Sequence, residues 1–172
     1  MLALIAAVLA SASAPTSMLE ASTPWWERIS VTVDDKGTQQ SCFYQSSLSP
    51  TGAETCDEAM AASVQPRRTQ LQSGLYSKLT FERRFSPGGK LDSGRLQAGD
   101  ELLGQQVMFL TIDPDGSIGS CRVVGTSGDL LPTYGCDEAK SEQFRAQASA
   151  PSQAPRQAFM TIMVYGHQEQ IA

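Results

Sequence analysis

The sequence has little of what several common functions require. Its formal charge is −5, from 18 acidic and 13 basic residues, and it has no stripe of Lys and Arg that would hold a nucleic-acid backbone or an anionic membrane. His167 is the only histidine, which excludes a Ser-His-Asp apparatus in each part of the chain and disfavours a zinc site. We therefore expect no nucleic-acid partner, no metal, no cofactor and no catalytic residues.

The sequence also lacks an apolar run that would cross a bilayer. Residues 2–9 are apolar, but a membrane-spanning helix needs roughly 20 such residues. Small residues follow at 10–12, which is the arrangement of a signal peptide and its cleavage site. We predict a signal peptide over 1–12, a flexible leader over 13–25 and a periplasmic protein with no membrane span. The alternative is a short buried helix, since no basic residue follows Met1.

Two stretches of the chain repeat each other. Residues 31–42 align without a gap on residues 110–121, with Thr, Asp, Gly, Ser and Cys at the same offsets. Further along, Cys-Asp-Glu-Ala occurs at 56–59 and again at 136–139. Because both motifs recur together, we predict two tandem copies of one small module.

Each copy has the pattern strand, turn, strand, helix, strand. In the second copy, residues 107–112 and 117–124 are rich in strand-forming types and flank an Asp-Pro-Asp-Gly turn. A Gly-containing loop over 125–128 follows, and then a short helix with an acidic start at Asp137. The closing strand, 159–165, has apolar residues on both faces, so we expect both of its faces to be covered.

The first copy repeats this order, with strands at 29–33 and 38–45 and a closing strand at 75–81. We therefore predict an α+β protein of two β-β-α-β modules, each with a three-stranded antiparallel sheet. The predicted boundaries are 26–85 for the first module, 86–103 for a linker and 104–170 for the second module.

The four cysteines follow the repeat. Pairing within each module joins Cys42 to Cys56 and Cys121 to Cys136. Each bond would close a loop of about 15 residues and contribute roughly 3 kcal/mol. A redox pair is the alternative, but catalytic dithiols usually sit as C-x-x-C at a helix N-terminus, and neither pair has that spacing. We therefore predict structural disulfides.

Two further motifs have ordinary explanations. The acidic turn that begins at Asp113 resembles a calcium loop, but its twelfth position is Val124 where a bidentate Glu is needed. Trp25 and Trp26 precede the first strand, where such residues either form a binding platform or, more often, close the end of a core. We therefore predict that the acidic motif forms a turn and that the two tryptophans close the end of a core.

These motifs together resemble the C-terminal domain of the TonB energy transducers and of related TolA-type proteins, in two tandem copies. Residues 112–116, 123–128 and 159–165 fall where that family has its acid-Gly turn, its V-x-x-S-S-G segment and its closing strand. Some members also carry cysteines like Cys121 and Cys136. The spanning helix and the Pro-rich linker of complete transducers are not seen in this sequence, so we expect a binding or accessory module.

The resemblance implies a way of binding. Domains of this family add an extended peptide of an outer-membrane transporter to an open edge of their sheet. Here it implies that a strand edge lined by Phe159, Thr161, Met163 and Tyr165 binds the partner. Which edge is free depends on how the modules pack, and the alternative is that the two modules cover each other's edges and the protein binds through another surface. We predict a non-catalytic periplasmic protein that binds an envelope partner, such as an outer-membrane transporter. An exported enzyme or thiol oxidoreductase, or a purely structural envelope protein, is the alternative.

Overall fold

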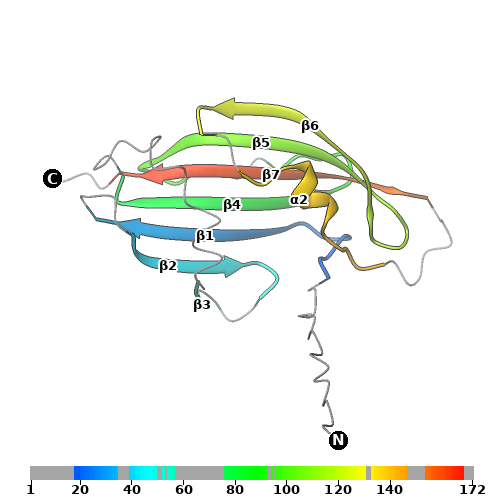
Figure 1. The fold of residues 1–172 in the computed structure, drawn as a ribbon, viewed down its shortest axis with the longest axis horizontal. Coiled ribbons are helices and arrows are strands. Elements are labelled where there is room, and N and C mark those ends of the chain that lie inside the picture. The colour runs from blue at the N-terminus through cyan, green and yellow to red at the C-terminus, as the bar shows by residue number, and fades with distance from the viewer. Residues whose placement is uncertain are drawn as a thin grey trace, which may run out of the picture.

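The computed structural model describes residues 18–34, 39–49, 52, 54–56, 76–92, 94, 96–130, 133–146 and 154–168. These residues form one antiparallel sheet of seven strands in the order β3-β2-β1-β4-β7-β5-β6 (Figure 1). The prediction of an α+β fold built from two three-stranded β-β-α-β modules is therefore wrong. Both repeats contribute their strands to a single sheet, and the described part of the chain is almost entirely β-structure.

Two hairpins form the outer parts of the sheet. In the first, β1 (Trp25–Val33) pairs with β2 (Gln39–Ser46), and in the second, β5 (Asp100–Ile112) pairs with β6 (Ile118–Gly128). Both hairpins were predicted from the alternation of strand-forming residues, and both are confirmed. The loop predicted over 125–128 is wrong, because these residues continue β6 to its end.

The turn of the second hairpin has the form that its sequence favours. The amide of Gly116 donates a hydrogen bond to the carbonyl of Asp113 at 2.9 Å. The φ angle of Gly116 is +89°, which side chains rarely allow, so glycine is needed at this position. The acidic residues of this segment thus serve a tight turn, and Asp115 accepts hydrogen bonds from Ser117.

The closing strands of the two repeats pair with each other. β4 (Lys78–Pro87) lies beside β1, β7 (Arg156–His167) lies beside β5, and β4 and β7 join in the middle of the sheet. The short β3 (Glu54–Thr55) lies outside β2. The strand order is therefore mirrored about the β4–β7 pair. A three-stranded sheet leaves two edges open, and this pairing covers one edge of each repeat.

One short helix is described. α2 (Cys136–Lys140) begins where the sequence predicts a helix, with Asp137 and Glu138 in its first turn, but it spans little more than one turn. The helix predicted after Cys56 in the first repeat lies outside the described residues. In the described part of the chain, no helix has the length and apolar character needed to cross a membrane.

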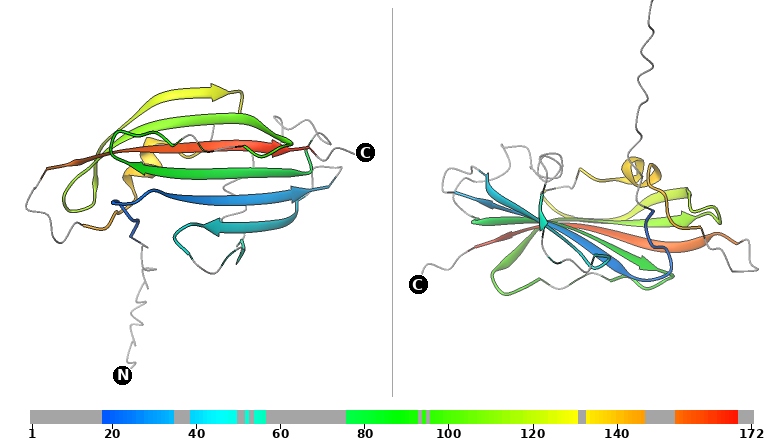
Figure 2. Two further views of the ribbon diagram at one scale, coloured as in Figure 1. Left: turned by 180° about the vertical axis from the view of Figure 1, so that it is seen from behind. Right: turned by 90° about the horizontal axis from the view of Figure 1, so that it is seen from below.

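The main hydrophobic core lies on the face of the sheet that α2 covers (Figure 2). Trp25 is 2% exposed and stacks on Phe85, with ring centroids 5.4 Å apart. Trp25 therefore closes the end of the core, as predicted, whereas Trp26 is only partly buried and is not part of the core. Large buried side chains from the neighbouring strands fill the rest of the core: Met108, Leu110, Ile112, Met160 and Ile162.

Both disulfides predicted from the repeat are present. Cys42 is bonded to Cys56 and Cys121 to Cys136, with Cα atoms 5.3 and 5.5 Å apart. The first bond fastens β2 to the residue that follows β3, and the second fastens β6 to the first residue of α2. Both lie on the core face: Cys121 and Cys136 pack against the main hydrophobic cluster, and Cys42 belongs to a smaller cluster against which Cys56 packs.

The opposite face is crossed by the segment between β4 and β5, whose described residues 88–92, 94 and 96–99 we call the strap (Figure 2). Asp92 of the strap pairs with Arg84 of β4 at 3.0 Å. Gly94 lies so close to the sheet that a Cβ atom there would be 2.7 Å from Arg84 Nε and 2.9 Å from Met163 Cε. The predicted linker over 86–103 thus contains the end of β4, a strap packed on the sheet and the start of β5.

The predicted signal peptide lies outside the described residues. Within the predicted leader, the first residue that the structure describes is Met18. The next residue, Leu19, is buried and forms a parallel bridge with Phe144. The Trp25 indole donates to the carbonyl of Glu20 at 2.7 Å. The part of the leader that directly precedes β1 is therefore packed on the fold.

Candidate binding edge

The strand that the family resemblance implies as the binding strand lies inside the sheet. β7 pairs with β4 along one edge and with β5 along the other. Its backbone groups are used on both sides, so no edge remains for an added peptide. The prediction that Phe159, Thr161, Met163 and Tyr165 line a free strand edge is wrong, because the closing strand of the first repeat occupies that edge.

These four side chains lie on the face of the sheet that the strap crosses. Thr161, Met163 and Tyr165 are buried there. Phe159 packs edge to face against Phe109 of β5, with ring centroids 5.3 Å apart. The predicted residues are thus brought together on one face, where they contribute to packing.

The sheet ends in β2 and β3 on one side and in β6 on the other. The outer edge of β2 is covered where β3 pairs with Phe43 and Tyr44, and the Cys56 amide donates to the Cys42 carbonyl at 3.2 Å. β6 pairs with β5, and no described strand lies along its outer edge. With 11 residues, β6 therefore offers a long row of backbone N–H and C=O groups to a partner.

β6 has few of the features that protect natural sheet edges. Such edges are usually protected by Lys, Pro, inward-pointing charges or β-bulges, and of these β6 has two bulges. Arg122 is the one charged residue of β6, and the strand contains no Pro. Val123 and Val124 are 47% and 43% exposed. Exposed β-branched side chains on an edge strand gain packing when another strand lies beside them.

Two bulges divide β6 into shorter regular stretches. The register against β5 shifts at Gly119 and again at Val124, and neither residue has a partner opposite it. Between them, residues 120–123 pair in regular order with residues 108–111. Beyond the second bulge, residues 125–128 pair in regular order with residues 104–107. Because a bulge disrupts the ladder and increases the twist, a regular added strand fits along one of these two stretches.

The stretch of β6 over residues 120–123 is held on both faces of the sheet. On the core face, Cys121 is bonded to Cys136 at the start of α2. On the other face, the Arg122 guanidinium lies over the ring of Phe109, 5.1 Å from its centroid. The edge is therefore presented in a fixed conformation, which lowers the entropy that binding would cost.

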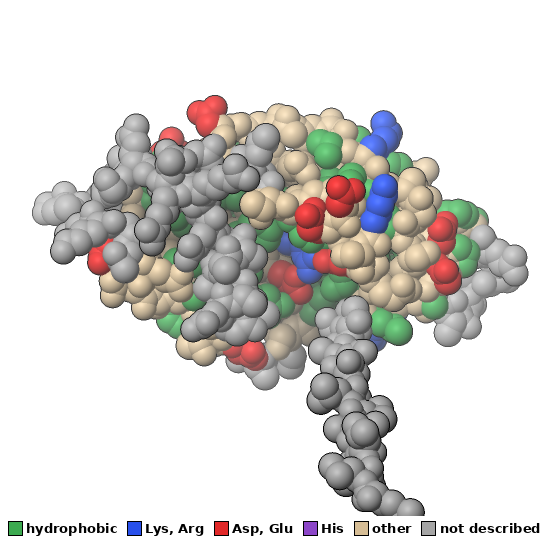
Figure 3. Space-filling view, in the orientation of Figure 1, with side chains coloured by type: hydrophobic (Ala, Val, Ile, Leu, Met, Phe, Trp, Pro, Cys, Tyr) green, Lys and Arg blue, Asp and Glu red, His purple; other side chains and the backbone are tan. Residues whose placement is uncertain are grey.

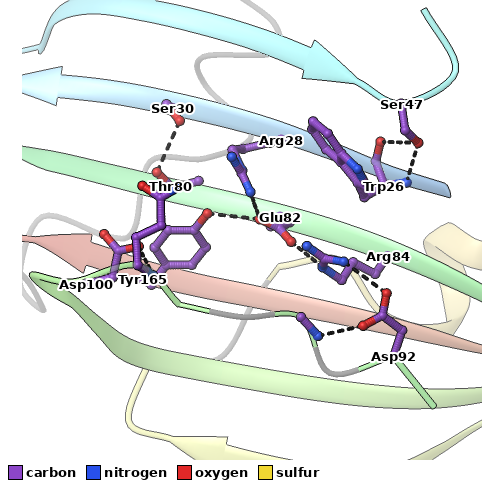
Figure 4. Close-up of polar contacts among 12 residues, drawn as sticks. Trp26, Arg28, Ser30, Ser47, Thr80, Glu82, Arg84, Asp92, Asp100 and Tyr165 are labelled. Atoms are coloured by element: carbon purple, nitrogen blue, oxygen red, sulfur yellow. Dashed lines mark hydrogen bonds and ion pairs between the residues drawn. The ribbon is translucent and has the colours of Figure 1, made fainter.

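A buried carboxylate lies farther inside the sheet, beneath the strap (Figure 4). Glu82 is 2% exposed; Arg28 donates to it at 2.9 Å, Arg84 pairs with its other oxygen, and the Tyr165 hydroxyl donates to it at 2.9 Å. Burial would lower the pKa of the Arg28 guanidinium, but its hydrogen bond and ion pair with Glu82 raise it. Burial and the same carboxylate raise the pKa of the Tyr165 hydroxyl. Arg28 therefore stays charged and Tyr165 protonated at neutral pH.

A second charged cluster lies on the core face of β1 and β4. Arg83 lies between the rings of Trp25 and Tyr134, 5.2 Å from each centroid, and pairs with Glu27 and Glu142. Figure 3 shows acidic and basic side chains close together near the middle of this face. Burial would lower the pKa of Arg83, but the two carboxylates raise it. Burial and the Glu142 carboxylate raise the pKa of the Tyr134 hydroxyl.

Both charged clusters are internally paired. Each arginine in them faces at least one carboxylate, so the charges are neutralised within the fold. Over the described ranges, no three His, Cys, Asp or Glu side chains are grouped to hold a metal ion, and all four cysteines are in disulfides. The feature best suited to receive a partner is the backbone edge of β6.

Sequence reasoning predicted most of β6 as a strand but did not identify it as an edge. A usable signal was present in Val123 and Val124, two apolar residues in succession within a strand. Because neighbouring side chains in a regular strand point to opposite faces, such a pair in a thin sheet indicates either coverage of both faces or exposure. Here both valines are exposed.

No protein-family model, curated protein or solved structure matches this chain. The resemblance to the TonB C-terminal domain therefore rests on the sequence motifs alone. The single sheet and the β6 edge are features of this chain itself and do not depend on that resemblance.

Proposed function

We propose that this protein is a non-catalytic binding module that takes up an extended segment of a partner protein as an added strand along β6. The observation that carries the proposal is the outer edge of β6, which is long, exposed and fixed by the Cys121–Cys136 disulfide. In such binding, main-chain hydrogen bonds supply affinity and side-chain contacts supply selectivity. The receiving strand is the second strand of the C-terminal repeat, not its closing strand.

We also propose that the protein works in the periplasm. Two disulfides favour an oxidising compartment, and the predicted signal peptide agrees with it. The partner we propose is an envelope protein, and the family resemblance points to an outer-membrane transporter.

Site-specific photo-cross-linking in cells tests where a partner binds. A photoreactive residue at Val124 lies on the candidate edge at a bulge position, where a replacement leaves the β5 pairing in place. The matched control is Leu91 of the strap, an apolar residue that is 49% exposed. We expect a defined envelope protein to be cross-linked from position 124 and not from position 91.

A synthetic peptide that covers the cross-linked segment tests the mode of binding. It should slow amide hydrogen exchange in β6. N-methylation of its alternate amides removes the donors that face β6 and should abolish this protection. Equal cross-linking from both positions, or protection of a different element, would overturn the proposal.

A further inference from the structure

The side chains beside the open edge define the chemistry of the segment that pairs there. We infer that the partner segment carries an acidic residue between two apolar residues, with the carboxylate directly opposite Arg122. This inference rests on the proposed strand addition at β6. It follows from the register of the sheet, from the contacts of Arg122 and from the surroundings of Cys121 and Val123.

The two bulges limit where an added strand can pair regularly. Regular pairing in β6 spans residues 120–123, between Gly119 and Val124, and residues 125–128 beyond the second bulge. Only the first of these stretches is fastened to α2 by a disulfide and carries a charged side chain, so we place the added strand there. Arg122 lies within this stretch, with Cys121 before it and Val123 after it. A strand that pairs there must therefore place one residue opposite Arg122 and its two neighbours opposite Cys121 and Val123, whichever direction it runs.

Arg122 is the outermost member of a row that crosses three strands. Phe159 of β7 is opposite Phe109 of β5, and Phe109 is opposite Arg122 of β6. The two rings pack edge to face, and the guanidinium lies over Phe109. The next position in this row belongs to the incoming strand. The row thus directs a cation toward the partner.

The Arg122 guanidinium is well placed for a carboxylate. Its side chain is exposed, and among the described residues no acidic side chain pairs with it. Stacking on Phe109 uses one face of the guanidinium and leaves its N–H donors in the plane. A carboxylate on the neighbouring strand can accept from two of these donors at once, which is the strongest geometry for this pair.

The other face of the stretch favours apolar neighbours. Val123 is 47% exposed and is opposite Met108, a core residue, so an apolar side chain beside Val123 would extend the core outward. Cys121 is bonded to Cys136, and the exposed Asp137 follows it in α2. An acidic residue placed on this face would be repelled there. The face that carries Arg122 is therefore the one that accepts the acid.

Three synthetic heptapeptides test the inference. They carry a central Glu, Gln or Lys between two Val residues on a Ser/Thr background, and their binding is measured with the full-length oxidised protein at peptide concentrations up to the millimolar range. Because opposite charges across two strands attract and like charges repel, we expect the Glu peptide to bind about 10-fold more tightly than the Lys peptide. The Gln peptide should lie between them.

Charge reversal on the protein provides the decisive comparison. Arg122→Glu should invert the order of the three peptides, and Arg122→Gln should remove the difference between them. Lys90→Glu makes the same change of charge at another exposed site and should keep the original order. Circular dichroism of each variant checks that the sheet remains folded.

Amide exchange separates the two proposals. If all three peptides protect β6 equally, strand addition stands and the acidic preference is overturned. If no peptide protects β6, or N-methylated peptides bind as well as the unmodified ones, strand addition itself fails. Inversion by Arg122→Glu together with protection of β6 supports both.

Discussion

At the scale of single residues, opposite charges determine how β1 and β4 align. Glu27 is opposite Arg83 on the core face, and Arg28 is opposite Glu82 on the strap face. A slip of either strand would separate both pairs and leave Glu82 buried without Arg28 beside it. Since an unpaired buried charge is costly, these four residues specify one register for the centre of the first repeat.

Replacing Glu82 tests this role. Glu82→Gln removes the carboxylate and leaves Arg28 and Arg84 half-buried without their common partner. We expect the free energy of unfolding to fall by about 3 kcal/mol, measured by urea denaturation. The control Glu101→Gln is exposed and keeps an acceptor for the Tyr76 hydroxyl, so it should change stability by less than about 0.5 kcal/mol. Equal effects would contradict the prediction.

The attachment of the strap should depend on pH. Hydrogen bonding from the Gly94 amide and the nearby Arg84 guanidinium hold the pKa of Asp92 below its usual value of 3.8. A lowered pKa in the folded state means that ionised Asp92 stabilises the fold above its unfolded pKa. This contribution is lost as the pH falls through the folded pKa.

We therefore expect wild type and Asp92→Asn to differ in amide protection of the strap near neutral pH. The difference should disappear once the pH falls below the folded pKa of Asp92, where the wild-type carboxyl is also protonated. Asp129→Asn, at an exposed position outside the strap, serves as the control and should match wild type throughout. A difference that persists unchanged in acid would show that the carboxylate charge is not what holds the strap.

At the scale of elements, local sequence patterns were sufficient to predict the two hairpins but insufficient to predict which strands lie at the edges of the sheet. The Asp-Pro-Asp-Gly turn and the alternation around it determine β5 and β6, because those contacts are close in sequence. The two apolar faces of β7 were also read correctly, since the core covers one and the strap the other. Which strand lies beside β7 depends on hydrogen bonds between backbone groups. Because every residue has these groups, the side-chain pattern did not indicate the neighbouring strand.

The disulfide of the second repeat should stabilise β6 specifically. Replacing Cys121 and Cys136 by Ala releases β6 from α2, and we expect a loss of about 3 kcal/mol in the free energy of unfolding. Amide exchange should accelerate more in β6 than in β2, because β6 gains local opening in addition to the global destabilisation that both strands share. Replacing Cys42 and Cys56 by Ala is the matched control and should show the opposite distribution.

The same bond distinguishes a structural role from a redox role. A thiol oxidoreductase would have a pair that mild reductant opens readily in the native protein, giving free thiols by titration. We expect both disulfides to resist such treatment until the sheet unfolds. Rapid and selective reduction of one pair in the folded protein would favour the redox alternative.

At the scale of the whole molecule, the β4–β7 pair joins the two repeats into one folding unit. The residues of β4 and β7 pair over the full length of β4, from Lys78 opposite His167 to Pro87 opposite Ala158. Neither repeat can unfold without exposing a strand edge and core surface of the other. We expect one cooperative transition in urea, reported identically by tryptophan fluorescence of β1 and by amide exchange of β6. Two separate transitions would show that the repeats fold independently.

The mirrored strand order has a consequence for stoichiometry. A sheet with two receptive ends can link one partner to the next without limit, in the manner of a growing fibre. In this molecule, one end carries the short β3, which pairs with two of the eight residues of β2 and is fastened to it by the Cys42–Cys56 disulfide, whereas the other end is the long β6. The proposed strand addition therefore predicts a monovalent receptor: each copy should take one segment along β6, and the assembly should stop there.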